Sequence, residues 1–175
     1  DRNVTAGLTV SDASLKVEVA KEVKSVAKFD GATESKFVGG DSGEARLLVF
    51  NNWGKFDPNT MEGQTLRDIS ISFKAAGVAD VLAKTGAKSI KAFIGVNSND
   101  WSVNTLGNTV PSAGVVEIEK DGTYTVSYTA AGEITLGNQL GVMFADIDSA
   151  LEKDDDKNVT AGSVSYTHLR AHETV

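Results

Sequence analysis

The sequence predicts an all-β fold: an antiparallel β-sandwich, jelly-roll-like, with about eight strands and at most one short helix. Three observations lead to this prediction. Apolar and polar residues alternate with a period of two along most of the chain. Glycine, asparagine, aspartate and serine separate the alternating stretches, as turn residues do. A single segment has helical character, which is too few crossovers for a parallel sheet.

The strands are predicted from this alternation. The clearest case is Ile69–Phe73, whereas Ala45–Phe50 is an apolar run typical of a sandwich core. The Asp121-Gly122 pair predicts a β-hairpin between its flanking strands, because glycine supplies a positive φ. The other predicted strands are Arg2–Val10, Ile90–Val96, Val115–Glu119, Thr123–Tyr128 and Gln139–Ile147.

The single predicted helix is Val78–Lys88, where valine, leucine and alanine residues precede a stop at Gly86. The aromatic residues inside predicted strands are expected in the core. These are Phe50, Phe73, Phe93 and Phe144.

Composition excludes several classes of function. The 175 residues carry a net charge of −7, which argues against nucleic acid or an anionic membrane as partner. No apolar run is long enough for membrane insertion, and there is no cysteine for a disulfide or a thiol nucleophile. No signal peptide opens the chain, and we expect it to be a fragment of a secreted or cell-surface protein.

A seven-residue segment occurs twice. Asp1–Gly7 recurs as Asp156–Gly162 with Lys157 in place of Arg2, which predicts tandem copies of one domain. On this interpretation residues 1–19 are the last strand of a preceding repeat, 20–28 are a linker, and 29–162 are the β-sandwich module. The alternative is two similar strands within one domain. If the chain comes from a tandem array, neighbouring copies of the same domain are its partners in the parent chain.

The chain from about residue 163 onward has a different character. The run VSYTHLRAHET resembles a translated sequencing adapter, as found in assembled metagenomes, and we interpret 163–175 as an adapter-derived tail. A metal-binding pair at His168 and His172 is excluded with it, and the rest of the chain contains no histidine. Catalytic sites that need an imidazole are therefore not expected. We expect no enzyme; a small glycosidase with a carboxylate pair is a minor alternative.

Two tryptophans lie in polar, loop-like segments. Trp53 follows Asn52, and Trp101 follows Asn99 and Asp100. A sugar ring presents an apolar face edged by hydroxyls, so its site needs an exposed aromatic ring with amide and carboxylate groups nearby. These five residues are the candidate carbohydrate-binding site. In the alternative, each tryptophan packs inward and caps one end of the sandwich.

Several stretches resemble a known kind of domain. ARLLVFNNWG, IKAFIGVNSNDWSV, VVEIEKDGTYTVSY and LGVMFADID are similar to a carbohydrate-binding-module-like β-sandwich domain of secreted gut Firmicutes proteins. The similarity covers roughly residues 29–162. It implies glycan binding through loop aromatics, in proteins where such domains accompany polysaccharide-degrading enzymes or cell-surface modules. Composition and spacing by themselves only permit this function.

Acidic residues gather near the end of the predicted module. Asp146, Asp148 and Asp155 are candidate ligands for a structural Ca²⁺, which extracellular sandwich domains bind through oxygen atoms. The spacing does not match an EF-hand, and the alternative is a solvated turn. No other cofactor is expected.

Two functions follow from these observations. The first is a non-catalytic extracellular module that binds a polysaccharide of the plant cell wall or another glycan through its loop tryptophans. The second is a structural spacer or adhesin repeat of a bacterial cell-surface protein, in which the tryptophans belong to the core. Exposure of Trp53 and Trp101 distinguishes the two.

Overall fold

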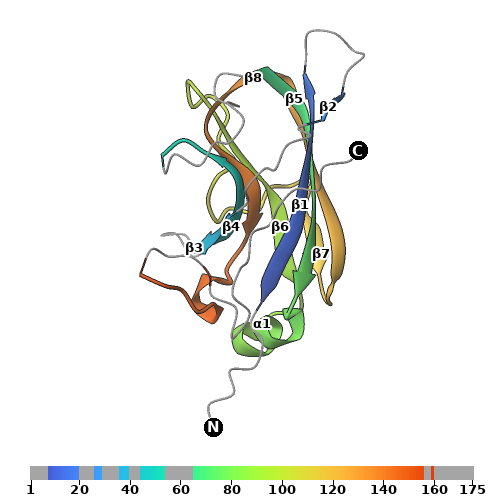
Figure 1. Cartoon of the computed structure of the whole chain (residues 1–175), viewed down its shortest axis with the longest axis vertical. Helices are drawn as coiled ribbons and strands as arrows, with labels where there is room; N and C mark the ends of the chain where they lie inside the picture. The colour runs from blue at the N-terminus through green and yellow to red at the C-terminus, as the bar shows by residue number, and fades with distance from the viewer. Residues whose placement is uncertain are drawn as a thin grey trace.

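The structure is a computed structural model that describes residues 8–19, 26–28, 36–39, 44–53, 65–155 and 159 (Figure 1). All the strand pairs described are antiparallel. The predicted all-β antiparallel class with one short helix is therefore confirmed. The elements are β1 (Thr9–Val19), β2 (Val26–Lys28), β3 (Lys36–Gly39), β4 (Ala45–Asn51), β5 (Thr65–Ala76), α1 (Val78–Thr85), β6 (Ile90–Ser98), β7 (Val116–Ile118), β8 (Gly122–Phe144) and a 3-10 turn (Asp148–Ala150).

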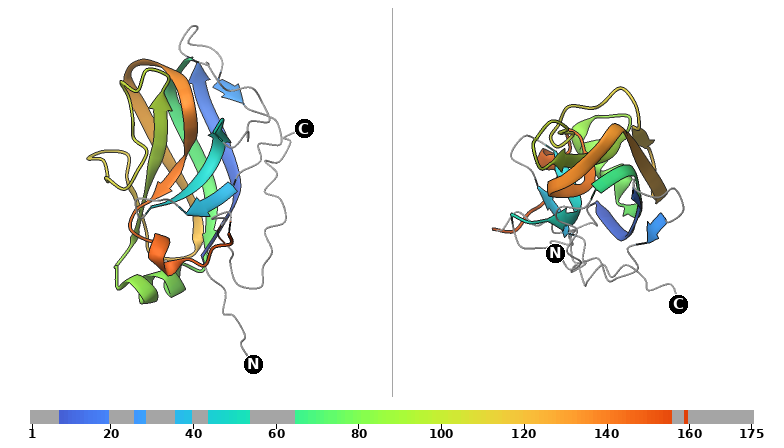
Figure 2. Two further views of the ribbon diagram at one scale, coloured as in Figure 1. Left: turned by 90° about the vertical axis from the view of Figure 1, so that its left-hand side faces the viewer. Right: turned by 90° about the horizontal axis from the view of Figure 1, so that it is seen from above.

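Strand β8 joins all parts of the sheet. Its first part pairs with β5, from Gly122 to Thr135, and its last part lies between β4 and β6. The resulting order is β2-β1-β5-β8-β4-β3, with β6 on β8 and β7 on β6. The strands form one curled sheet (Figure 2). This strand pairing does not establish the finer prediction of a jelly-roll-like sandwich, because β8 belongs to both parts of the sheet.

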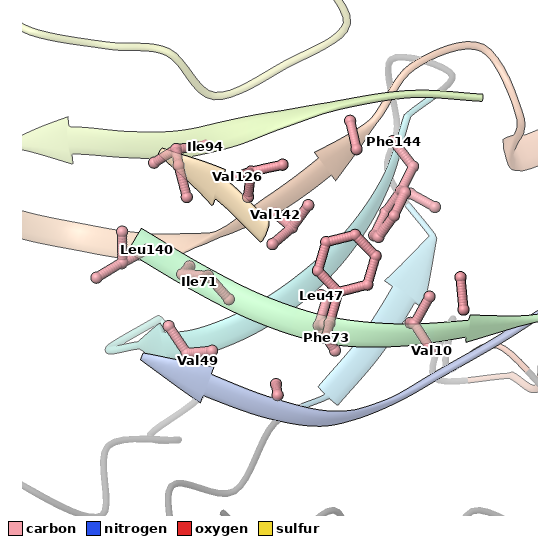
Figure 3. Close-up of a cluster of buried hydrophobic side chains, with 14 of the residues drawn as sticks. Val10, Leu47, Val49, Ile71, Phe73, Ile94, Val126, Leu140, Val142 and Phe144 are labelled. Atoms are coloured by element: carbon pink, nitrogen blue, oxygen red, sulfur yellow. The ribbon is translucent and has the colours of Figure 1, made fainter. Parts of the chain in front are cut away.

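The hydrophobic core lies inside the curl. Phe73 on β5 contacts Phe144 on β8 edge to face, with ring centroids 5.4 Å apart. Side chains from β1, β4, β5, β6 and β8 converge around them (Figure 3). Burying each such ring contributes roughly 1.5–3 kcal/mol, so this cluster is the main source of stability. The four phenylalanines predicted for the core, Phe50, Phe73, Phe93 and Phe144, are at most 1% exposed.

A second, smaller apolar cluster anchors the long connection between β6 and β7. Phe93 packs there with Met143 and Ala145, separately from the main core. Leu106, Val110 and Val115 of the connection cover this cluster. The connection that carries Trp101 is therefore held against the sheet at its far end.

The predicted helix is confirmed, but the predicted hairpin beside it is wrong. Helix α1 ends at Thr85, and Gly86 adopts the left-handed conformation (φ 72°) that commonly terminates helices. Strand β7 pairs with β6, whereas the start of β8 pairs with β5, so the Asp121-Gly122 turn does not join two paired strands. Instead, the Asp121 carboxylate accepts a hydrogen bond of 3.0 Å from the backbone N–H of Val78, at the start of α1.

Other strand boundaries differ from the alternation pattern. The two strands predicted at Thr123–Tyr128 and Gln139–Ile147 are one continuous strand, β8. Between them the pairing with β5 shifts register after Thr129 and resumes at Ile134, and from Leu136 onward β8 pairs with β6. Strand β1 continues to Val19, and Val26–Lys28 pairs with it although it falls in the predicted linker.

Some predictions concern residues outside the described ranges. These are the repeated segments Asp1–Gly7 and Asp156–Gly162, apart from Val159, and the tail at 163–175. Val159 is buried and forms an isolated bridge with Lys153. The division into repeats stays a prediction, while the described part of 1–19 pairs with β5 in the same sheet as the rest.

Candidate functional site: a tryptophan pair at one end of the sheet

The topology brings the two tryptophan turns to the same edge. Strands β4 and β6 both pair antiparallel with β8, so they run in the same direction on either side of it. Asn51 near the end of β4 pairs with Gln139, and Ser98 at the end of β6 pairs with Leu136. Neighbouring strands are about 4.8 Å apart, so the two ends lie on the order of 10 Å from one another. The turns that follow both strands can therefore meet.

Trp53 and Trp101 are the large exposed hydrophobic residues of the described chain. They are 57% and 47% exposed, and their rings stack with centroids 6.0 Å apart and planes inclined by 18°. Such a pair contributes about 0.5–1.5 kcal/mol beyond the area it buries. We call these two residues the tryptophan pair. Because the rings stay largely in solvent, the pair presents an apolar surface that the fold itself does not cover.

The turn before Trp101 is held by backbone hydrogen bonds. The N–H of Trp101 donates to the carbonyl of Ser98 at 3.0 Å, and the N–H of Asn99 donates to the carbonyl of Thr135 on β8 at 2.8 Å. Trp101 has a φ of 61°, a left-handed conformation that is unusual for a bulky residue. Such strain costs on the order of 1–3 kcal/mol and persists only where the surroundings impose it. The turn thus fixes the direction in which the Trp101 side chain leaves the backbone.

Asp100 completes this turn as a fixed negative charge. Its Oδ1 accepts hydrogen bonds from Ser98 Oγ at 2.8 Å, from Ser102 Oγ at 2.8 Å and from the Ser102 N–H at 3.0 Å. The hydrogen bonds from Ser102, together with that from Ser98, lower the pKa of Asp100 from 3.8 to about 2. The side chain is exposed and ionised at neutral pH.

A chain of amide groups connects the two turns beneath the tryptophan pair. Asn97 on β6 donates from Nδ2 to Asn138 Oδ1 at 3.0 Å, and Asn138 donates from Nδ2 to Asn52 Oδ1 at 2.9 Å. The Oδ1 of Asn97 also accepts from the N–H groups of Asn138 and Gln139. A Cβ added to Gly137 would lie 2.7 Å from Asn97 Nδ2, so this series of hydrogen-bonded amides requires glycine at position 137. Both turns are tied through these amides to β8.

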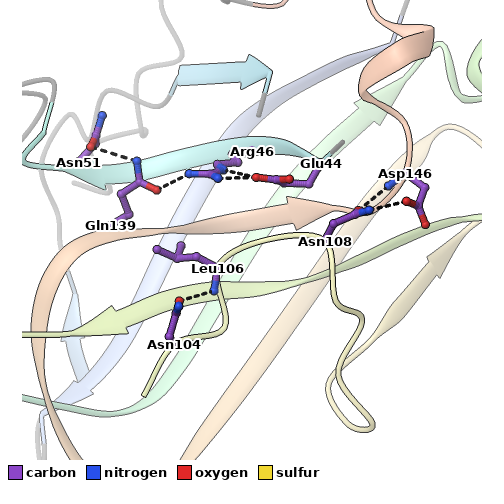
Figure 4. A network of polar contacts seen from close by, with 8 residues as sticks. All are labelled: Glu44, Arg46, Asn51, Asn104, Leu106, Asn108, Gln139 and Asp146. Carbon is purple, nitrogen blue, oxygen red and sulfur yellow. Dashed lines mark hydrogen bonds and ion pairs between the residues drawn. The ribbon is translucent and has the colours of Figure 1, made fainter. Parts of the chain in front are cut away.

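A second polar chain supports the Trp53 turn from inside the sheet. The backbone N–H of Trp53 and Gln139 Nε2 both donate to Asn51 Oδ1, each at 3.2 Å. Gln139 Oε1 accepts from Arg46 Nη1 at 2.7 Å, and Arg46 is paired with the fully buried Glu44 (Figure 4). A buried carboxylate is tolerated when such a partner neutralises it. The chain of contacts leads from a buried ion pair to the base of the Trp53 turn.

The candidate residues divide by what their side chains do. Trp53, Trp101, Asn99 and Asp100 are exposed and gathered in the two turns. Asn52 is committed internally, because its Nδ2 donates to the carbonyl of Gly137 at 3.3 Å and its Oδ1 accepts from Asn138. Asn52 therefore positions Trp53.

The site residues predicted from the sequence do not include the supporting amides, which are those of Asn51, Asn97, Asn138 and Gln139. The available signal was polar amide residues at the ends of three predicted strands, Ala45–Phe50, Ile90–Val96 and Gln139–Ile147.

The acidic residues considered for Ca²⁺ have other partners. Asp146 exchanges hydrogen bonds with Asn108, whose Nδ2 donates to Asp146 Oδ1 at 2.5 Å (Figure 4), and Asp148 pairs with Lys153 at 2.6 Å. Asp155 is exposed. In the residues that the structure describes, no group of three acidic or histidine side chains is arranged to hold a metal. A structural Ca²⁺ stays a prediction from the sequence, checked by whether Ca²⁺ raises the melting temperature.

Comparisons of the chain with protein-family models, curated proteins and solved structures found no match. Within the described ranges, no helix has the length and apolar character to cross a membrane. The geometry of the tryptophan pair and its surroundings is therefore the observation that bears on function.

Proposed function

We propose that this chain is a non-catalytic extracellular module that binds polysaccharide on its tryptophan pair. The observation that carries the proposal is the juxtaposition of Trp53 and Trp101, two exposed rings that come from separate turns and stack at 6.0 Å. Exposed indole rings offer a flat apolar surface of the kind that the C–H face of a sugar requires. The plant cell wall and other insoluble glycans are the proposed ligands.

The support beneath the pair favours binding over an accidental exposure. Ordered turns, a left-handed residue at Trp101 and two hydrogen-bonded polar chains hold the turns that carry the rings before any ligand arrives. Preorganisation reduces the entropy lost on binding, because the rings do not have to be ordered at that moment. In the rival function, a spacer or adhesin repeat, the tryptophans would be part of the core, and their exposure of 57% and 47% favours the binding module.

The proposed place of the module is a tandem array in a secreted or cell-surface protein. Two rings make a small contact area, so a single module would bind weakly. Linked copies gain overall affinity from effective concentration alone, by roughly 10²–10⁴-fold when they bind one polymer together. Repetition of the Asp1–Gly7 segment at Asp156–Gly162 supports such an array.

The test is a pull-down of the full chain on insoluble cellulose, xylan and mannan, with Trp101→Ala as the comparison variant. We expect the wild type to sediment with at least one of the polysaccharides and the variant to stay in the supernatant. Because Trp101 is exposed, its replacement should leave the fold intact, which a circular dichroism spectrum checks. A wild type that binds no glycan across a broad panel would refute the proposal and leave the spacer function.

A further inference from the structure

The polar groups that remain free beside the tryptophan pair are few. Asn52, Asn97 and Asn138 use their amides on one another and on β8. The three hydrogen bonds that Asp100 accepts from Ser98 and Ser102 all end on Oδ1. Two groups next to the pair have unused capacity: the exposed carboxamide of Asn99, for which no side-chain hydrogen bond is described, and the Oδ2 of Asp100, which of the two carries charge.

This charge has no cation beside it in the described part of the chain. The ion pairs with described partners include those of Arg46 with Glu44, Lys84 with Asp80 and Lys153 with Asp148, and none of these includes Asp100. A carboxylate whose geometry is fixed by three hydrogen bonds, and which is exposed, is available to pair with a cation from outside. The faces of indole rings attract cations as well, and tryptophan is the aromatic side chain that does so best.

We propose that the site prefers glycans with free amino groups, in which an ammonium group pairs with Asp100 while the sugar ring lies on Trp101 and Trp53. This inference rests on the proposed function and names its ligand class. An amino sugar carries the two features that complement the site, an apolar face for the indole rings and a positive charge for Asp100, on the same sugar ring. A neutral sugar of the same size would leave the charge of Asp100 unpaired.

The test compares three soluble oligosaccharides of equal length by isothermal titration: a glucosamine oligomer with free amines, its fully N-acetylated form and a glucose oligomer. We expect the amine form to bind most tightly. Asp100→Asn should weaken its binding about two- to fivefold and leave the other two sugars unchanged, since an exposed ion pair is a modest contribution. Trp101→Ala should abolish binding of all three.

The matched control is Glu119→Gln, because a cationic polymer is also attracted to the whole acidic chain. Glu119 is exposed and lies in the turn at the α1 end of β8. Its replacement by glutamine changes the net charge by the same amount as Asp100→Asn. Glu119→Gln should bind like the wild type. Three results would overturn the inference: an equal loss of affinity in both variants, equal affinity for the amine and acetylated forms, or equally tight binding of an oligolysine. The proposed function would stand in these cases if neutral glycans bind. Binding of no glycan at all would overturn both.

Discussion

Gly141 lies opposite Leu48, where β8 pairs with β4. A Cβ at this position would overlap with the backbone oxygen of Leu47, and a backbone atom in a paired strand has no room to move away. We predict that Gly141→Ala lowers the free energy of unfolding by about 1–3 kcal/mol, the usual cost of overpacking. Urea denaturation followed by circular dichroism measures it.

Gly122 provides the control in the same strand. A Cβ there would lie 3.6 Å from Tyr124 Cε2, an ordinary contact distance. Gly122→Ala should change the free energy of unfolding by no more than about 0.5 kcal/mol. Equal effects of the two substitutions would show that β4 and β8 are not as close as described.

Asp100 predicts a specific pH dependence. Its pKa is lowered from 3.8 to about 2, so the folded state favours the ionised form and gains stability at pH values above 3.8. That gain falls as the pH drops through the folded-state value near 2, where the protonated carboxyl resembles an amide. The stability difference between wild type and Asp100→Asn should therefore be largest above pH 3.8 and shrink towards pH 2. A difference that stays constant over this range would contradict the hydrogen bonding of Asp100.

Helix α1 depends on a residue from another element. Its N-cap position is Gly77, which has no side chain to bond the first free N–H groups, and Asp121 supplies the missing acceptor from the β7–β8 turn. A negative charge at this end of a helix is favourable as well. We predict that Asp121→Ala costs about 1 kcal/mol of stability. Thermal denaturation with Glu119→Ala as control measures it, and a melting temperature equal to that of the control would refute the capping role.

The elements show which sequence signals can be trusted. The strand predicted at Ala45–Phe50 is confirmed as β4, because an apolar run of this length belongs in a buried strand. The predicted helix is confirmed as α1, with Gly86 as the stop signal at its end. The hairpin at Asp121-Gly122 is wrong because a turn sequence does not say which strands it joins. In this fold Asp121 caps a helix, and Gly122 begins β8. Pairing between distant strands is a property of the whole sheet, which local alternation does not encode.

At the scale of the whole molecule, the sequence indicates both tryptophan turns but not their contact. Trp53 and Trp101 could be assigned to polar turns from their neighbours alone. Their stacking depends on β4 and β6 lying on either side of β8, and the alternation pattern predicts two strands where the single strand β8 lies. The amide chain through Asn97 and Asn138 depends on the same pairing. The chemistry of the site was therefore predictable, while its assembly required the sheet.

The central claim is that the tryptophan pair acts as one glycan-binding surface, and affinity electrophoresis in a gel containing the best-bound polysaccharide tests it most directly. The variants are Trp53→Ala, Trp101→Ala and the double substitution, with Glu119→Ala as a surface control. Because the rings stack at 6.0 Å, we predict that each single variant loses most of the retardation and that the double variant loses little more. Single variants that migrate like the wild type would contradict the claim.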